Sequence, residues 1–294
     1  MTEKHVNVDG KQITVTNPDK LLFPEISITK WDYVMHMARL APYMLPHTKD
    51  RLLTVIRFPN GVDKKSFYQK NMPDYAPDWI SSVRWKETRY ILLQDIPTLV
   101  WLATQAALEF HVSFHLANND LPAELVFDLD PSVEGFDKVT EVALDLYHCL
   151  KSLGLHSYAK TSGATGIQVY VPIARKYTFE QTRKIGHFLG MFLQEKKPSL
   201  VTLERFKKHR RNKVYFDYLQ HWRGKTIAAP YSPRAKKHAP VSTPIFWSEL
   251  ERGVNPADFH LLNIHKRLQE TGDLFRQMNQ KRQSLDNILH FINT

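Results

Sequence analysis

The stretch at residues 125–131 (LVFDLDP) constrains this chain more than any other part of its sequence. Its valine, phenylalanine and leucines favour a strand, and Pro131 ends that strand because it cannot donate to a continuing ladder. Side chains alternate between the two faces of a strand, so Asp128 and Asp130 share one face, while Phe127 and Leu129 point into the core. The stretch therefore predicts a strand with one apolar face and one acidic face.

Two carboxylates about 7 Å apart on one face repel each other, so the pair favours binding of a cation. Oxygen ligands of this kind suit Mg²⁺ or Mn²⁺, with a bound phosphate completing the coordination shell. A solvated acidic strand end would show the same pattern. The metal-site interpretation therefore requires a third carboxylate and a set of cationic groups elsewhere in the chain.

The composition narrows the class of protein. The chain has 294 residues, of which 43% are hydrophobic and 12% aromatic, and this content supports a packed core. It contains no apolar run long enough for a membrane helix and begins without a signal-peptide pattern. A single cysteine, Cys149, excludes an internal disulfide and a cysteine-rich zinc site. We therefore expect a soluble cytoplasmic protein.

The charge of the chain indicates its partner. The net charge is +10, and the basic residues cluster at 207–211 and 236–238. Such a balance favours a polyanionic partner.

Periodicity and turn residues predict a mixture of helices and strands along the chain. We expect one domain over 1–294, with an N-terminal lobe to about 50, a core over about 51–260 and a C-terminal helical segment over about 261–294. The predicted helices are 30–44 (capped by Thr29), 97–110, 136–153 and 179–195, with a mostly helical tail from 258. The predicted strands are a hairpin over 4–16, then 51–58, 66–70, 90–94, 155–160, 167–172 and 213–218.

A third carboxylate and further polar groups occur after the acidic strand. Asp217 lies on the face of its strand opposite Val214 and Phe216, so it is a candidate for the third carboxylate, and the basic run at 207–211 leads into this strand. The turn at 161–166 (TSGATG) lets backbone N–H groups approach an anion, and its hydroxyls add donors.

A second polar face occurs earlier in the chain, where the alternating segment 109–115 places His111, Ser113 and His115 on one side. These are either part of a phosphate or metal site or structural side chains satisfied by hydrogen bonds.

Taken together, these motifs resemble the polymerase domain of bacterial ligase D, within the archaeo-eukaryotic primase superfamily. The resemblance covers nearly the whole chain, and the order and spacing of the motifs make it specific. The motifs are TNPDKLLFPE at 16–25, TK at 29–30, FYQK at 67–70, LEFH at 108–111, VFDLDP at 126–131, KTSG at 160–163, FDYL at 216–219 and AAPYSPR at 228–234.

The resemblance implies an α+β fold, with a primase-like catalytic core of antiparallel sheets around the carboxylates and helices packed outside. It also implies a repair polymerase or primase of bacterial non-homologous end joining. Such an enzyme adds NTPs or dNTPs at DNA ends and at short gaps bearing a 5′-phosphate, by a two-metal mechanism with Mn²⁺ or Mg²⁺. It also implies Ku and a separate DNA ligase as partners, a monomeric state and a location at the bacterial nucleoid. The matching positions are Asp128, Asp130 and Asp217 for the catalytic metals; Ser162, His111, Arg210 and Arg234 for the triphosphate and sugar; Phe67 for base stacking; and Lys20 and Lys30 for the 5′-phosphate of the downstream strand.

The sequence departs from the family pattern at two nucleotide-binding positions. The family loop reads Ser-Gly-Gly-Lys-Gly-x-His, whereas this chain has Thr165 and Gln168 at the lysine and histidine positions. Both can donate hydrogen bonds, but neither brings positive charge, and a charge-assisted contact is about twice as strong as a neutral one. We therefore expect weaker nucleotide binding, or greater reliance on the metals and the two arginines.

Two alternatives remain open. Three carboxylates beside basic residues also serve a metal-dependent nuclease or phosphodiesterase, although hydrolysis does not need a dedicated aromatic platform for a base. A catalytically weakened module that only binds DNA ends is the other alternative. Retention of three aspartates argues against that module, because unpaired carboxylates weaken a DNA-binding surface.

Overall fold

A computed structural model describes residues 2–133 and 135–293, and its chain separates into two compact units. The first unit comprises Met1–Ser113, Thr226–Ser242 and Phe259–Gly272, and the second comprises Phe114–Lys225, Thr243–Asp258 and Asp273–Thr294. These boundaries differ from the lobe boundaries expected at about 50 and 260. That the 294 residues form a single functional domain stays a prediction.

The second unit is built on a six-stranded sheet, in which every neighbouring pair is antiparallel except the edge pair β14–β15. Its strands, in spatial order, are β14 (Val201–Thr202), β15 (Val214–Asp217), β11 (Glu124–Pro131), β13 (Ile167–Pro172), β12 (Tyr158–Thr161) and β17 (Pro244–Ile245). The predicted acidic strand, β11, therefore lies at the centre of the sheet.

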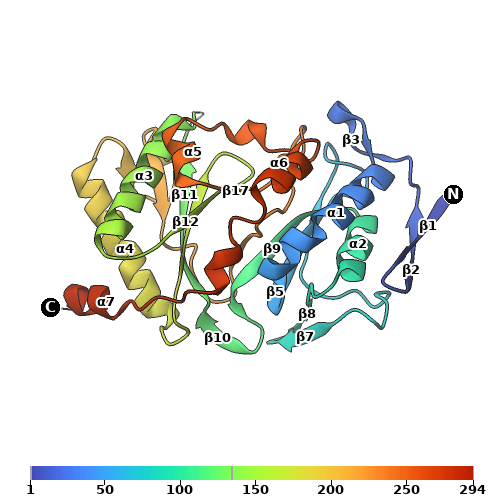
Figure 1. The fold of residues 1–294 in the computed structure, drawn as a ribbon, viewed down its shortest axis with the longest axis horizontal. Helices are drawn as coiled ribbons and strands as arrows, with labels where there is room; N and C mark the ends of the chain where they lie inside the picture. The colour runs from blue at the N-terminus through green and yellow to red at the C-terminus, as the bar shows by residue number, and fades with distance from the viewer. Residues whose placement is uncertain (1, 134, 294) are drawn as a thin grey trace. The chain divides into compact units, whose positions relative to one another are not determined.

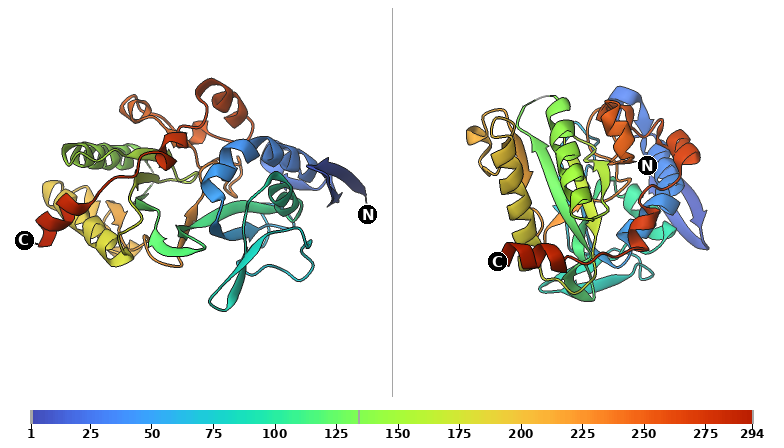
Figure 2. Two further views of the ribbon diagram at one scale, coloured as in Figure 1. Left: turned by 60° about the horizontal axis from the view of Figure 1, so that its bottom comes forward. Right: turned by 60° about the vertical axis from the view of Figure 1, so that its left-hand side comes forward.

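Helices α3 (Asp137–Ser152) and α4 (Phe179–Lys196) pack against this sheet, and Figures 1 and 2 show them beside β11 and β12. Phe127 and Phe216 meet on the apolar side, with ring centroids 5.6 Å apart. Helix α4 comes close to that side at Gly190, where a Cβ would stand 3.0 Å from the Phe216 ring. The acidic side chains of β11 alternate with these aromatics, so they occupy the opposite face.

The remaining helical segments of the second unit are short. They are α5 (Trp247–Glu251), α7 (Asp286–Asn293) and the 3-10 turns η2 (Lys207–His209), η3 (Pro256–Asp258) and η4 (Arg276–Asn279).

The first unit contains most of a five-stranded sheet with the order β10-β9-β5-β6, to which β16 adds by pairing with β9. These strands are β10 (Asn119–Pro122), β9 (Ala107–Leu116), β5 (Arg51–Arg57), β6 (Phe67–Gln69) and β16 (Thr226–Ala228). Strand β9 begins in the first unit and ends in the second, because the boundary between the units falls after Ser113. Strand β10 follows β9 in the sequence and belongs to the second unit.

Helices α1 (Lys30–Thr48) and α2 (Ile96–Thr104) lie side by side in the first unit, which also includes α6 (Ile264–Thr271) (Figure 1). Three two-stranded ribbons complete this unit: β1 (Glu3–Val8) with β2 (Lys11–Thr16), β3 (Leu21–Phe23) with β4 (Ile28–Thr29), and β7 (Ser82–Trp85) with β8 (Thr88–Ile91). The short turn η1 (Pro24–Ile26) links β3 to β4. Thr29 caps α1 as expected, because its side chain accepts a hydrogen bond from the Asp32 N–H.

Two local predictions were wrong. The helix expected over 97–110 ends at Thr104, and after a left-handed residue, Ala106, the chain continues as β9. The tail from 258, expected to be mostly helical, has two short α-helices joined by irregular segments and a 3-10 turn. In each case, pairing or packing partners distant in sequence decided the local structure.

No helix among the described residues combines the length and apolar character needed to cross a membrane.

Candidate active site

The sheet of the second unit aligns four polar side chains in one row. Asp128 on β11 lies opposite Asp217 on β15 and opposite Gln168 on β13, and Gln168 in turn lies opposite Lys160 on β12. Residues directly opposite in adjacent strands present their side chains to the same face. Asp130, two residues after Asp128, lies on this face as well, opposite Tyr215. The sheet therefore gathers the three predicted carboxylates on the face opposite Phe127.

This row carries excess negative charge at Asp128. Burial raises the pKa of the Asp128 carboxyl well above its ordinary value, and the neighbouring Asp130 and Asp217 carboxylates raise it further. Two contacts act in the opposite direction: Gln168 Nε2 donates to Asp128 Oδ1 over 3.1 Å, and the positive charge of Lys160 favours the ionised form. A cation is the species that would relieve the remaining repulsion.

Asp217 is held by its own turn. Its Oδ1 accepts hydrogen bonds from the Tyr215 hydroxyl over 2.9 Å and from the N–H groups of Leu219 and Gln220 over 3.0 and 2.9 Å. Within residues 2–133 and 135–293, no group of three His, Cys, Asp or Glu side chains is arranged to hold a metal ion. The sheet thus places the three aspartates on one face, but their side chains do not form a preformed metal-binding cluster.

The donor set nevertheless fits a hard divalent cation. Every candidate ligand is an oxygen, which is what Mg²⁺ and Mn²⁺ prefer. Gln168 is only 4% exposed, and its Oε1 is buried without a hydrogen-bond partner beside Asp128. A buried acceptor left without a donor costs about 1–3 kcal/mol. The site therefore has both charge and an acceptor that a bound ion or substrate could satisfy.

The turn between β12 and β13 is organised by Ser162. Its Oγ accepts from the N–H of Ala164 over 3.1 Å and from the N–H of Gly166 over 3.0 Å. A side chain at Gly166 would collide with the Leu129 carbonyl oxygen, and its Cβ would stand 3.1 Å from Asp130 Oδ1. Glycine is therefore required for this turn to approach the acidic strand. Thr165 is exposed at the tip of the turn.

Tyr215 links two of the predicted site residues. Its hydroxyl contacts Asp217, while the Arg210 guanidinium carbon lies 3.9 Å from the centroid of its ring. Arg210 also donates to the backbone carbonyls of Glu204 and Arg205. Burial and the Asp217 charge raise the pKa of the Tyr215 hydroxyl, so it stays protonated and remains a donor.

In the first unit, His111 and Arg234 meet at one buried carboxylate. Glu109 Oε2 lies 2.9 Å from His111 Nε2 and 3.0 Å from Arg234 Nε, and its Oε1 accepts from the N–H of Ala235 over 3.0 Å. Burial by itself would raise the pKa of Glu109, but His111, Arg234 and this N–H bring it down to about 2. The carboxylate is therefore ionised and internally paired.

The other two polar residues expected on this face have structural partners. Ser113 Oγ accepts from the N–H of Leu52, and His115 is fully buried with its Nδ1 2.9 Å from the Leu116 carbonyl oxygen.

Phe67, the predicted base platform, is 44% exposed on β6. The Arg57 guanidinium carbon lies 5.2 Å from its ring centroid, and Arg57 is held by Gln69 and the Tyr75 hydroxyl. A supported aromatic ring with an accessible surface suits stacking against a base.

Lys20 and Lys30, the predicted 5′-phosphate ligands, lie near each other in the first unit. Lys20 Nζ donates to the Pro59 carbonyl over 3.0 Å, and Lys30 Nζ donates to the Thr16 carbonyl over 2.8 Å. Burial lowers the pKa of Lys30 to about 8, and the charges of Lys20 and Arg57 contribute. A phosphate dianion would relieve this concentration of positive charge.

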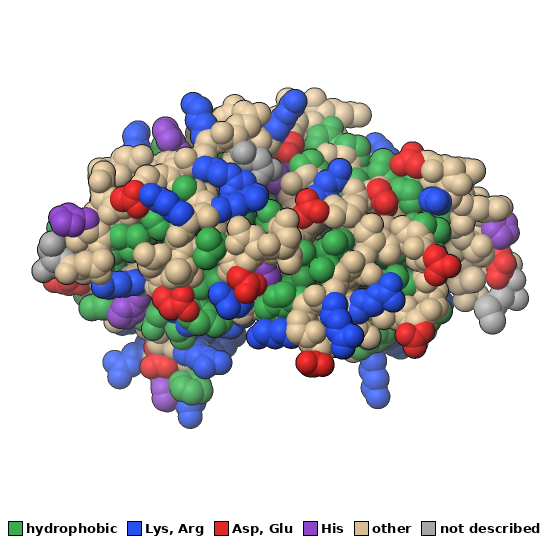
Figure 3. Space-filling view, turned by 90° about the horizontal axis from the view of Figure 1, so that it is seen from below, with side chains coloured by type: hydrophobic (Ala, Val, Ile, Leu, Met, Phe, Trp, Pro, Cys, Tyr) green, Lys and Arg blue, Asp and Glu red, His purple; other side chains and the backbone are tan. Residues whose placement is uncertain are grey.

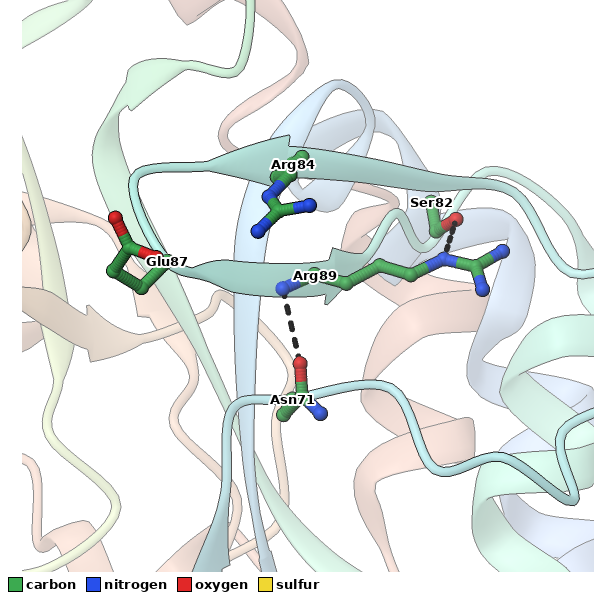
Figure 4. A pocket seen from close by; sticks show the side chains of 5 residues that line it. All are labelled: Asn71, Ser82, Arg84, Glu87 and Arg89. Atoms are coloured by element: carbon green, nitrogen blue, oxygen red, sulfur yellow. Dashed lines mark hydrogen bonds between the residues drawn. The ribbon is translucent and has the colours of Figure 1, made fainter.

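A pocket of about 430 Å³ in the first unit is lined by residues other than the predicted site residues. Figure 4 shows its lining, in which Arg89 donates to Ser82 and to Asn71, while Arg84 and Glu87 complete the wall. Figure 3 shows Lys and Arg interspersed with Asp and Glu on the face in view. The Lys and Arg side chains on that face therefore do not form one continuous positively charged patch.

Comparison with known proteins decides the family. The model of the LigD primase-polymerase domain matches residues 29–275. The chain belongs to this family.

The bifunctional non-homologous end joining protein LigD of Bacillus subtilis is 39% identical over 293 residues, covering 98% of this chain and 48% of that protein. The multifunctional LigD of Mycolicibacterium smegmatis is 34% identical over 275 residues, covering 90% of this chain and 36% of that protein. Among solved structures, the polymerase domain of Mycobacterium tuberculosis ligase D in complex with DNA superposes with a TM-score of 0.84 at 32% identity, covering 92% of this chain and 99% of that one.

These matches confirm the resemblance drawn from the sequence, the α+β class and the enzyme class, which is nucleotidyltransferase. The chain spans about half the length, or less, of the curated LigD proteins it matches. The assigned roles of individual LigD-type residues stay predictions.

Sequence reasoning missed Glu109, Tyr215 and Arg57 as parts of the site. Glu109 and Tyr215 each stand two positions from a predicted site residue on the same strand, His111 and Asp217 respectively, so period-two spacing was the available signal. Arg57 had no such signal, because β5 and β6 meet only in the folded sheet.

Proposed function

We propose that this domain carries out template-directed addition of nucleotides at DNA ends and at short gaps bearing a 5′-phosphate, in bacterial non-homologous end joining. The observation that carries the proposal is the register of β11 with β15, which places Asp128 opposite Asp217 with Asp130 on the same face. This arrangement occurs in a chain of the LigD primase-polymerase family. The M. tuberculosis relative was solved in complex with DNA, and nucleic acid is accordingly the proposed partner.

Asp128, Asp130 and Asp217 would hold Mn²⁺ or Mg²⁺, two ions in all, with Gln168 Oε1 as an additional oxygen nearby. When bound, such ions lower the pKa of the primer 3′-hydroxyl and stabilise the leaving pyrophosphate. The Tyr215 hydroxyl and the turn N–H groups all bind Oδ1 of Asp217, so they would orient this carboxylate and leave Oδ2 for an ion.

The chain's own side chains would bind and orient the substrates. Phe67 stacks on the base. His111, Ser162, Arg210 and Arg234 hold the triphosphate and sugar, and Thr165 and Gln168 also contact the nucleotide. Lys20 and Lys30 bind the 5′-phosphate and position the end without reading its sequence. Ku and a separate DNA ligase are the proposed partner proteins, and we propose that the domain acts as a monomer.

The decisive experiment is primer extension on a short-gapped duplex with a downstream 5′-phosphate, run with Mn²⁺ and with each nucleotide type. Wild type should add the templated nucleotide, and Asp128→Ala should not. Degradation of the end-labelled primer without added nucleotide would instead indicate a nuclease.

A non-catalytic end-binding module is the second candidate, and it is favoured because no group of three His, Cys, Asp or Glu side chains in the described part of the chain is arranged to hold a metal ion. No nucleotide addition, together with tight binding that depends on the 5′-phosphate, would support that candidate.

A further inference from the structure

Glu109 is the buried acid that stands between two residues of the proposed nucleotide site. It is 6% exposed, and a single oxygen, Oε2, contacts both His111 and Arg234, at 2.9 and 3.0 Å. These two side chains are 16% and 19% exposed, so they reach the surface of the unit while their common partner does not. The buried carboxylate thus connects the side chains of His111 and Arg234.

We propose that Glu109 is a positioning residue that holds His111 and Arg234 as one rigid pair and thereby sets how the domain receives the sugar and phosphates of the incoming nucleotide. This inference rests on the proposed function and adds a residue that the sequence motifs did not assign to the site.

The direction of the contacts supports this role. Glu109 engages Nε2 of His111, so the other ring nitrogen, Nδ1, lies on the opposite side of the ring. In the neutral ring, a proton shared with Glu109 stays on Nε2, so the lone pair is carried by Nδ1. The tautomer of His111, and with it discrimination between ribose and deoxyribose, would then depend on Glu109.

The contact to Arg234 uses Nε, at the base of the guanidinium. Fixing Nε sets the plane of the guanidinium, because the group is planar. An arginine with a fixed plane loses less side-chain entropy when it meets a phosphate. Glu109 would therefore preorganise Arg234 for the triphosphate.

The backbone around Arg234 is pinned to the same strand. The Phe110 N–H donates to the Ser232 hydroxyl over 2.9 Å, and the Ala229 N–H donates to the Phe110 carbonyl over 2.9 Å. Tyr231, between these contacts, has a φ of 65° and is 1% exposed. A buried non-glycine residue keeps such a conformation only when its surroundings enforce it. Glu109 completes this set of restraints at Arg234 and Ala235.

The test compares Glu109→Gln with Glu124→Gln, a matched control on β11 that is 5% exposed and outside the proposed nucleotide site. Single-nucleotide gap filling is measured with NTP and dNTP to separate kcat from KM, and DNA affinity is measured in parallel. We expect E109Q to raise the nucleotide KM at least about tenfold, the factor that loss of one charge-assisted hydrogen bond produces, with kcat within about threefold. The ratio of NTP to dNTP efficiency should move toward one. DNA affinity, and all values for E124Q, should stay near wild type.

Glu109→Asp provides a second variant that keeps the charge and is less prone to unfold. It should show an intermediate KM because the shortened side chain reaches only one partner well. A KM for E109Q within twofold of E124Q would overturn the inference. A parallel decline in kcat, nucleotide affinity and DNA affinity would also overturn the inference, because that pattern indicates a purely structural role.

Failure of the proposed function is recognised separately. If wild type adds no nucleotide, binding of a fluorescent ATP analogue to wild type and E109Q still reports on Glu109. Tighter binding by wild type than by E109Q would support the inference without catalysis, and equal binding would refute it.

Discussion

In the first unit, the buried carboxylate of Glu109 meets His111, Arg234 and the Ala235 N–H at 2.9, 3.0 and 3.0 Å. In the second unit, two of the charges that act on the Asp128 carboxylate are further aspartates. The pKa of Glu109 is accordingly lowered to about 2, whereas that of Asp128 is raised well above its ordinary value.

The contrast suggests a physical rule for the two kinds of site. Cationic side chains that receive an anion can be preorganised by a buried acid, because the acid holds them in place. Carboxylates that receive a metal cannot be neutralised in advance without weakening the metal's attraction. Their repulsion is therefore left in the fold, and the ion relieves it.

The largest expected effect concerns the carboxylates. Asp128→Asn should lower nucleotide addition at least about 1,000-fold, because it removes a carboxylate that we propose as a ligand of the catalytic metal. In the absence of divalent metal, the same change should raise the free energy of unfolding by about 1 kcal/mol, because it removes a repelled charge. Gap-filling rates and denaturant melts with EDTA measure the two quantities. If Asp128→Asn lost both activity and stability, the proposed difference between the Asp128 and Glu109 carboxylates would be contradicted.

Removing the buried carboxylate of the first unit, Glu109, should have the opposite effect on the free energy of unfolding. Glu109→Gln should lower the free energy of unfolding by about 2 kcal/mol, because it removes a buried charge that has partners. The same EDTA melts provide the measurement, with Glu124→Gln as the control. If Asp128→Asn and Glu109→Gln shifted stability in the same direction, the two units would not differ as described.

Gly166 tests whether the turn must approach the acidic strand. Gly166→Ala should destabilise the fold by about 2 kcal/mol and impair nucleotide addition, because the new Cβ collides with the Leu129 carbonyl. Gly186→Ala on α4 is the control. Its Cβ would meet Tyr218 at 3.4 Å, an ordinary contact, and alanine favours a helix by about 1 kcal/mol. Equal melting temperatures for the two variants would refute the steric argument.

Lys30 predicts a dependence on pH. Burial, with Lys20 and Arg57, lowers its pKa to about 8, and only the charged form binds phosphate strongly. Preference for a 5′-phosphate over a 5′-hydroxyl end should therefore decline as pH rises from 7 through about 8 to 9.5. The sign for stability is opposite: the unfolded chain holds this proton up to its ordinary pKa of 10.5, so the fold gains stability as pH rises from about 8 to 10.5.

Binding titrations with matched 5′-phosphate and 5′-hydroxyl DNA measure this preference across the pH range. Lys30→Met is the control and should show a smaller preference with less dependence on pH. A wild-type preference that stays constant from pH 7 to 9.5 would contradict the assignment of Lys30.

The smallest expected effect is at Gln168. Gln168→His should tighten apparent nucleotide binding by about three- to tenfold, because a histidine can bring the positive charge that the amide lacks. A nucleotide titration of the variant and wild type provides the measurement. Unchanged affinity would show that the departure from the family pattern has no energetic consequence for the nucleotide.

The sequence by itself determined which side chains share a face of each strand. Alternation placed Asp128 and Asp130 on one face of β11 and Asp217 opposite Phe216 on β15, since period-two geometry is local. Ordered motifs also predicted the family, which the comparisons confirmed. Helix starts were accessible for the same reason: the capping box at Thr29 involves residues only three apart.

Tertiary structure alone decided which of these residues touch. The register of β11 with β15 and β13, the bond from Tyr215 to Asp217, and the meeting of Arg234 with Glu109, 125 positions earlier, are contacts between distant segments. The same holds where local prediction was wrong: the predicted helix gave way at Ala106 because β9 pairs on both of its edges. Pairing and burial outweigh local propensity there, and a pattern read along the chain does not contain the partner that supplies them.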